Sequence, residues 1–325
     1  MSINLGGIIV AAALAAMTPA GSVQTEIEAP GPAGPLRGAM LTPASDIRAT
    51  VLVIPGSGAT DRDGNNPQGV SAAPYRLLAE GLAERGVTTI RVDKRGLFGS
   101  AGAVPDANAV SMPDYAADVH QWVESIRAGT GAPCVWLLGH SEGGLVALLA
   151  AQQPEGICGV VLVAAGGRPI GTVLREQLRA SPTFAPFLDQ AMAAIDSLEA
   201  GRRVNVENMP PALMPLFAPP LQDYMINLLS YDPAQLIAAV ERPVLIVQGR
   251  RDLHVGEIDA LRLAGANPRA RLTMIADANH VLKAAADDRA ANIATYGDPS
   301  LPLAPGIVDA IAEFVAPAQV AGRSE

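Results

Sequence analysis

The chain has 325 residues, of which 49% are hydrophobic and 17% are charged, so it can bury the core of one large domain that carries an insertion. Its 23 basic and 32 acidic residues give a formal net charge of −9 without basic clusters, which argues against nucleic acid or an anionic membrane as a partner. Aromatic residues make up only 4%, so platforms for stacking bases are not expected either.

The first 22 residues stand apart from the rest of the chain. The apolar run IIVAAALAAM is followed by small residues around Ala20, which is typical of a signal peptide and too short to span a bilayer. No Lys or Arg precedes the run, so the alternative is a disordered N-terminus on a cytoplasmic protein. We expect residues 1–22 to be a cleaved signal peptide and the mature protein to be periplasmic or secreted, with no integral membrane span.

After this segment, short β-branched runs alternate with helical stretches. Two segments, 24–29 and 36–41, are typical of antiparallel strands that lead into a sheet. Continuously apolar runs, which suit parallel strands covered on both faces, follow at residues 49–56, 87–93, 134–140, 159–166, 243–249 and 271–277. Helices are expected between or after them, at residues 73–85, 112–127, 142–152, 256–265 and 306–316. The alternation predicts an α/β fold with a mostly parallel eight-stranded sheet and helices on both faces.

One connection is far longer than the others. Residues 167–241 separate two adjacent strand candidates, and this segment is rich in Met, Leu, Phe and Pro. We interpret it as several short helices that form a cap. The cap would be inserted into a core made of residues 23–166 and 242–325.

The pentapeptide Gly139-His140-Ser141-Glu142-Gly143 lies between a predicted strand and a predicted helix. In that setting the pattern G-x-S-x-G is typical of a nucleophile on a strained turn, where glycines remove the clashes of a Cβ atom. The helix that follows directs its positive end toward the oxygen that becomes anionic. The alternative is a tight turn in a non-catalytic α/β domain. We predict that Ser141 is a catalytic nucleophile.

A serine hydroxyl needs a base, and the chain has four histidines from which to choose. His120 falls within a predicted helix, and His140 is the neighbour of Ser141, with a side chain that points away from it. His254 leaves no room for an acid on a separate strand before it. His280, on the loop after the last apolar run, fits the chain order of serine, acid and base. We predict His280 as the base and His254 as a loop or rim residue.

The acid is expected on the loop after the fifth apolar run, where Asp252 lies. A carboxylate there would hold the imidazole tautomer and stabilise the imidazolium. Asp277 is the competitor, although it is only three residues from His280. Asp232 and Glu257 are weaker options. For Asp252 itself, the alternative is a carboxylate that only forms a turn.

The loop PGSGATDRDGNNP after the first apolar run is expected to complete the site. Gly56 and Gly58 let the backbone approach a ligand closely, so the N–H groups of Ser57 and Glu142 are predicted to form an oxyanion hole. The loop imitates a dinucleotide-binding motif and a calcium loop. It lacks the third glycine of the first and the sixth-place glycine and terminal glutamate of the second, so neither ligand is predicted.

Two further groups of residues are assigned structural roles. Ion-pair networks near the site are expected from the charged residues Asp61, Arg62, Asp63, Asp93, Lys94 and Arg95. Cys134 and Cys158 each open an apolar run, and these runs should be neighbouring strands. Neither cysteine has a metal-like spacing. A disulfide is possible in an exported protein, but we predict two buried thiols.

Together these motifs resemble the α/β-hydrolase superfamily over nearly the whole chain after residue 24. Within it, IPGSGATDRDGNN, DKRG, GHSEGG and GRRD resemble the bacterial esterases often labelled serine-aminopeptidase-like hydrolases. The resemblance implies the α/β-hydrolase fold and a carboxylic ester hydrolase with the triad Ser141, Asp252 and His280. Relatives usually carry D-x-R-G-x-G-x-S, whereas DKRGLFGS has Phe98 at the second glycine, so we expect an altered loop there.

The expected reaction is hydrolysis of a small-molecule ester through an acyl-enzyme, with no metal or organic cofactor. The apolar cap favours a short-to-medium acyl chain. Peptide or amide hydrolysis is the alternative, and it would need an acidic anchor for an α-amino group, for which Glu142 is a candidate. A non-catalytic binding protein on the same scaffold would lack a triad member, and none is missing. Dehalogenase chemistry is disfavoured because serine, not aspartate, occupies the turn.

Overall fold

The computed structural model describes residues 21–317, so the apolar run of the predicted signal peptide lies outside the described residues. The described chain forms one eight-stranded sheet in the order β1-β2-β4-β3-β5-β6-β7-β8, in which only the β1–β2 and β2–β4 pairs are antiparallel. The strands are β1 (Val23–Ala29), β2 (Leu36–Thr42), β3 (Ala49–Ile54), β4 (Val87–Val92), β5 (Val135–His140), β6 (Ile157–Val163), β7 (Val244–Gly249) and β8 (Arg271–Ile275). The predicted mostly parallel sheet is confirmed.

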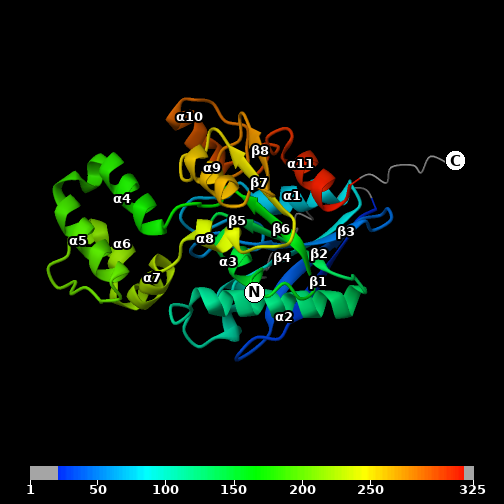
Figure 1. The fold of residues 1–325 in the computed structure, drawn as a ribbon, viewed down its shortest axis with the longest axis horizontal. Coiled ribbons are helices and arrows are strands. Elements are labelled where there is room, and N and C mark those ends of the chain that lie inside the picture. Colours follow the sequence, from blue (N-terminus) through cyan, green and yellow to red (C-terminus); the bar gives the residue numbers. More distant parts are fainter. Residues whose placement is uncertain (1–20, 318–325) are drawn as a thin grey trace, which may run out of the picture.

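Helices cover both faces of this sheet (Figure 1). The helices that correspond to the predicted ones are α1 (Pro74–Ala83), α2 (Met112–Thr130), α3 (Glu142–Ala150), α9 (Glu257–Ala266) and α11 (Ile307–Val315). Side chains of α2, α3 and α9 share one core with Leu52 and Ile54 of β3, whereas α1 and α11 share the other with Val51 and Val53. Successive residues of a strand face opposite sides, so a strand buried on both faces is apolar at most of its positions.

Helix α2 shows how the sequence determines where a helix begins, where it ends and which side is buried. Its N-cap Ser111 accepts from the backbone N–H of Asp114, and the Asp114 carboxylate accepts from the Ser111 N–H in return. The helix ends where Gly131 takes a left-handed φ of 73°. Its buried stripe follows the helical period and includes Tyr115, Val119, Trp122 and Ile126.

The long connection between β6 and β7 is helical. It contains α4 (Ile170–Ala180), α5 (Leu188–Glu199), α6 (Met214–Phe217), α7 (Gln222–Leu229) and α8 (Pro233–Ala238). Figure 1 shows α4 to α7 to one side of the sheet, while α8 returns and packs against α3 and α9. Ile195, Leu198 and Phe217 are buried among these helices and give the segment its own apolar interior. Within residues 21–317, no helix has the length and apolar character that a bilayer span needs.

The two cysteines correct the sequence analysis. Cys134 and Cys158 form a disulfide, with Cα atoms 5.2 Å apart, whereas two buried thiols were predicted. They lie at the starts of β5 and β6, which pair directly, as expected for neighbouring strands. Both residues are only partly buried and line a surface groove rather than the apolar core. Strand pairing therefore brings the sulfur atoms within bonding distance.

Candidate active site

Ser141 occupies the turn between β5 and α3. Its backbone is in a positive-φ conformation, with φ 53° and ψ −122°, which a residue with a side chain rarely adopts. The turn is tight, because a Cβ atom at Gly139 would collide with the Gly143 carbonyl, and one at Gly143 with the Ile54 carbonyl. Only glycine fits both positions. The Ser141 hydroxyl is thus presented at the carboxyl edge of the sheet.

His280 and Asp252 form a hydrogen-bonded pair on the loops after β8 and β7. The His280 Nδ1 atom lies 2.8 Å from Oδ2 of Asp252. The other carboxylate oxygen accepts from the backbone N–H groups of His254, at 2.7 Å, and Val255, at 2.9 Å. Burial opposes ionisation, but the charge of His280, its hydrogen bond and these two amides outweigh it and lower the pKa of Asp252. Asp252 is therefore a carboxylate that is held in place beside the His280 ring by three hydrogen bonds.

Helix α10 (Arg289–Ala294), which the sequence analysis missed, supports this pair. Asn292 accepts a hydrogen bond at 3.0 Å from the Asn279 amide, next to His280, and donates one at 2.8 Å to the Arg251 carbonyl, next to Asp252. One buried asparagine therefore connects the loops that carry the proposed base and acid. The segment DDRAANIA has no apolar period that would predict a helix.

Ser141, His280, Ser57 and Glu142 line one cavity of about 540 Å³, and Asp252 lies behind His280. The backbone carbonyl of His280 also lies 2.8 Å from Nε2 of His140, the residue before Ser141. The structure thus brings all five sequence-predicted site residues together. Ser57 and Glu142 contribute to the cavity from the loop after β3 and the first turn of α3.

His140 is part of a buried hydrogen-bond chain that the sequence analysis did not find. Its Nε2 faces the His280 carbonyl, so Nε2 carries the proton and Nδ1 accepts from the Tyr75 hydroxyl at 2.8 Å. The Tyr75 oxygen in turn accepts from the Gly56 N–H at 3.0 Å. Burial lowers the pKa of His140 to about 3, so this ring stays neutral. The chain connects the oxyanion loop to the loop of the proposed base.

The two charged clusters pair much as predicted. Arg62 binds Asp93 and Glu26, each at 2.7 Å, and Asp63 pairs with Arg91. Asp61 differs, because its carboxylate accepts from backbone amides of its own turn.

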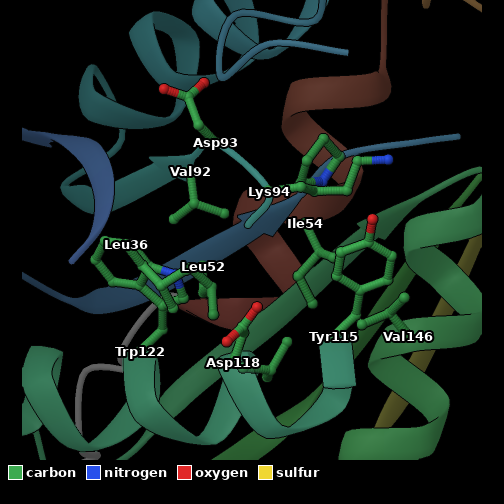
Figure 2. A pocket seen from close by; sticks show the side chains of 12 residues that line it. Leu36, Leu52, Ile54, Val92, Asp93, Lys94, Tyr115, Asp118, Trp122 and Val146 are labelled. Atoms are coloured by element: carbon green, nitrogen blue, oxygen red, sulfur yellow. The ribbon is translucent and has the colours of Figure 1, made fainter. Parts of the chain in front are cut away.

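The residues after β4 point to different parts of the fold. Arg95 is held by Asp118 through two bonds of 2.6 Å. Figure 2 shows the side chains of Asp93 and Lys94 pointing in opposite directions, beside a small, mostly apolar cavity of about 30 Å³. Asp93 faces Arg62, whereas the Lys94 ammonium reaches the oxyanion loop, where it donates to the Gly56 carbonyl at 2.7 Å. Phe98 takes a left-handed φ of 45°, so this position has a glycine-like backbone although it carries a side chain.

The wall of the large cavity is mainly apolar and comes largely from the connection between β6 and β7. Its apolar side chains include Ile170, Val173, Leu174, Leu216, Leu221, Met225 and Leu228. The carboxylates in its lining are Glu142 and Asp259. Asp259 is fully buried and binds Arg168 at 3.0 Å. Among residues 21–317, no group of three His, Cys, Asp or Glu side chains is arranged to hold a metal ion.

The residues that the sequence analysis considered as alternatives for the base and the acid have other positions or partners in the structure. His254 lies at the cavity with its ring centroid 4.8 Å from that of His280, and burial, then the charge of His280, lower its pKa to about 4. Asp232 caps α8 and pairs with Arg262 at 2.7 Å. Glu257 pairs with Arg250 at 3.2 Å, and Asp277 is exposed. Of these residues, only His254 borders the cavity.

Comparison with known proteins agrees with this fold. The family model described as "Alpha/beta hydrolase family" matches residues 51–295. Esterase EstD of Thermotoga maritima is 25% identical over 236 residues, covering 71% of this chain and 54% of the relative. A putative carbamate hydrolase, RutD of Variovorax paradoxus, is 32% identical over 148 residues, covering 45% of this chain and 48% of the relative. The chain thus spans about half the length of the curated relatives it matches.

Among solved structures, the hydrolase GrgF from Penicillium sp. sh18 superimposes with a TM-score of 0.55 at 21% identity. The match covers 79% of this chain and 91% of the other. At that level of identity the similarity concerns the fold alone.

Proposed function

The chain belongs to the alpha/beta hydrolase family, and on that premise we propose that it is a serine esterase that works through an acyl-enzyme. The observation that carries the proposal is the cavity shared by Ser141 and His280, with Asp252 hydrogen-bonded to the far side of the imidazole. A serine hydroxyl becomes a nucleophile when a neighbouring base accepts its proton, and the base must be held in one tautomer. The similarity to Esterase EstD supports the same class of reaction.

In the proposed mechanism, Ser141 Oγ attacks the ester carbonyl while His280 Nε2 accepts the hydroxyl proton. The Asp252 carboxylate keeps the proton on His280 Nδ1 and stabilises the imidazolium. The backbone N–H groups of Ser57 and Glu142 bind the oxyanion of the tetrahedral intermediate. His280 then protonates the leaving alcohol. Water, activated by the same base, attacks the acyl-enzyme and releases the acid.

The cavity wall supports a short-to-medium acyl chain as the preferred substrate. Its apolar side chains contribute most of the surface around the proposed nucleophile, which suits burial of an alkyl group. The volume of about 540 Å³ is within the range of cavities that hold small molecules.

The same wall disfavours an aminopeptidase, which would need a carboxylate free to bind an α-amino group. Glu142 faces Lys94, with 3.8 Å between carboxylate and ammonium, and Asp259 is occupied by Arg168. Both carboxylates of the cavity lining are therefore already paired with cations inside the protein. An incoming ammonium group would have to displace one of these buried pairs, which is costly.

The proposal is tested with Ser141→Ala and an ester series. Wild type should hydrolyse p-nitrophenyl butyrate, and Ser141→Ala should lose this activity by a factor of about 10⁴ or more while keeping its unfolding transition. A matched aminoacyl anilide should react far more slowly than the ester. Full activity of Ser141→Ala would remove the nucleophile, and faster reaction of the anilide would favour the peptidase.

We also propose that the protein is exported. The Cys134–Cys158 disulfide supports this proposal, because disulfides persist mainly in oxidising compartments. N-terminal sequencing of the mature protein from its native host tests it. A new terminus near residue 22 is expected, and an intact Met1 on the cytoplasmic protein would contradict export.

A further inference from the structure

The peptide unit between Gly56 and Ser57 carries the first of the two proposed oxyanion donors. Its N–H belongs to Ser57 and its carbonyl oxygen to Gly56. Because a trans peptide is planar, the N–H and the C=O point in opposite directions, so whatever fixes the carbonyl also fixes the donor. Among residues 21–317, the Ser57 N–H donates to no protein acceptor, and Ser57 lines the cavity.

The group that fixes this carbonyl is Lys94. Its ammonium donates to the Gly56 oxygen at 2.7 Å, and the side chain is almost entirely buried. The same ammonium lies 3.8 Å from the carboxylate of Glu142 and 5.5 Å from the ring centroid of Tyr115. Burial lowers the pKa of Lys94 below its ordinary value, and the Glu142 carboxylate opposes this shift in part by favouring the charged form.

We infer, on the basis of the proposed function, that Lys94 is a positioning residue for the oxyanion hole. It orients and polarises the Ser57 N–H through the Gly56 carbonyl. A cation bound to a carbonyl draws electron density from the peptide and makes the N–H at its other end a stronger donor. Lys94 also pairs with the side chain of Glu142, whose backbone N–H is the second proposed donor. One buried cation therefore contacts the carbonyl of the peptide unit that carries the first donor and the side chain of the residue that supplies the second.

A buried cation after β4 does not have to contact the oxyanion loop. The neighbouring cation Arg95 is also buried, yet its guanidinium is held by Asp118 and Asp114 on α2 and donates nothing to the oxyanion loop. The chain has only two lysines, and the other, Lys283, is also buried and donates to a backbone carbonyl, that of Leu301. Both lysines thus support loop backbone rather than the solvent-exposed surface.

The test replaces Lys94 by methionine, which keeps the length and removes the donor and the charge. We expect kcat on p-nitrophenyl butyrate to fall by about 10- to 100-fold with KM within about twofold, because an oxyanion donor acts in the transition state. An alkylboronic acid, whose tetrahedral adduct with Ser141 places an oxygen in the oxyanion hole, should bind more weakly by a similar factor. The corresponding alcohol, which fills the cavity without an adduct, should bind as before.

Lys94→Gln and Arg95→Met complete the set. Glutamine keeps a donor without the charge and should recover part of kcat, and it serves as the test variant should Lys94→Met fail to fold. Arg95→Met removes a buried cation from the same loop and should lower stability with no selective loss of boronic acid binding.

The outcomes separate the two proposals. Unchanged kcat in both Lys94 variants, or equal weakening of boronic acid and alcohol, would overturn the role of Lys94 alone. A wild-type protein without Ser141-dependent hydrolysis would overturn the proposed function and this inference with it.

Discussion

Tyr75→Phe removes one hydroxyl from the buried chain that connects Gly56 to His140. The change leaves two buried groups without a partner, the Gly56 N–H and Nδ1 of His140. Each orphaned group costs about 1–3 kcal/mol, so the free energy of unfolding should fall by about 2–6 kcal/mol. Activity should fall as well, because Gly56 and the His280 carbonyl are no longer connected.

The assay is urea unfolding of wild type and variant, together with kcat on p-nitrophenyl butyrate. Thr89→Val is the matched control, because the Thr89 hydroxyl is fully buried and, within residues 21–317, has no hydrogen-bond partner. Removing that hydroxyl should raise stability by about 1 kcal/mol and leave kcat unchanged. If Tyr75→Phe costs less than about 0.5 kcal/mol, or if both variants shift stability alike, the Tyr75 hydroxyl does not bridge these groups.

Two further predictions concern the disulfide and the proposed acid. Cys134→Ala/Cys158→Ala opens a loop with a sequence separation of 24 and should lower the free energy of unfolding by about 3–4 kcal/mol. The kcat should not change, because the disulfide joins the ends of β5 and β6 that lie opposite Ser141, and a lower kcat in the folded protein would contradict this. Asp252→Asn should lower kcat by about 10⁴-fold. Because folding lowers the pKa of Asp252, its carboxylate stabilises the folded protein above the ordinary aspartate pKa of 3.8, and this stabilisation is lost as the pH falls. The free energy of unfolding, measured as the pH is lowered, should therefore decrease less in Asp252→Asn than in wild type. An equal loss in both proteins would show that Asp252 does not contribute.

The strands of the sheet could be predicted because the apolar pattern of each strand lies within one short stretch of sequence. A strand covered on both faces is mostly apolar, and each of the six apolar runs overlaps a strand with a parallel neighbour. Strand β4 departs most from this pattern, because it also buries Thr88, Thr89 and Arg91. The turn at Ser141 was equally readable, since its residues are contiguous in the sequence. Gly139 is required by a contact with Gly143, whereas Gly143 is required by the Ile54 carbonyl of β3. Helix boundaries in the core differ from expectation by at most three residues, as for α2, which continues to Thr130.

The contacts between loops could not be predicted, because they depend on the order of strands in the sheet. Lys94 follows β4, Gly56 follows β3 and His140 ends β5, and in the sheet β3 lies between β4 and β5, an order that differs from the order in the chain. The sequence analysis assigned Lys94 to an ion-pair network and set His140 aside, since neither residue has a local pattern that reveals its partner. The disulfide was missed for a related reason: which cysteine atoms meet depends on the register of β5 against β6.

Gly56 shows why the contacts that fix the oxyanion loop are hydrogen bonds to its backbone. A Cβ atom there would lie 3.3 Å from the Cβ of Ser141, so the close approach of the oxyanion loop to the nucleophile favours a residue without a side chain. A glycine cannot be fixed by packing, and its position must come from its backbone groups. Tyr75 accepts from its N–H and Lys94 donates to its carbonyl, and both side chains are buried, where hydrogen bonds are stronger than in water. The loop is therefore fixed through its own peptide groups, which are the groups the proposed chemistry requires to be in place.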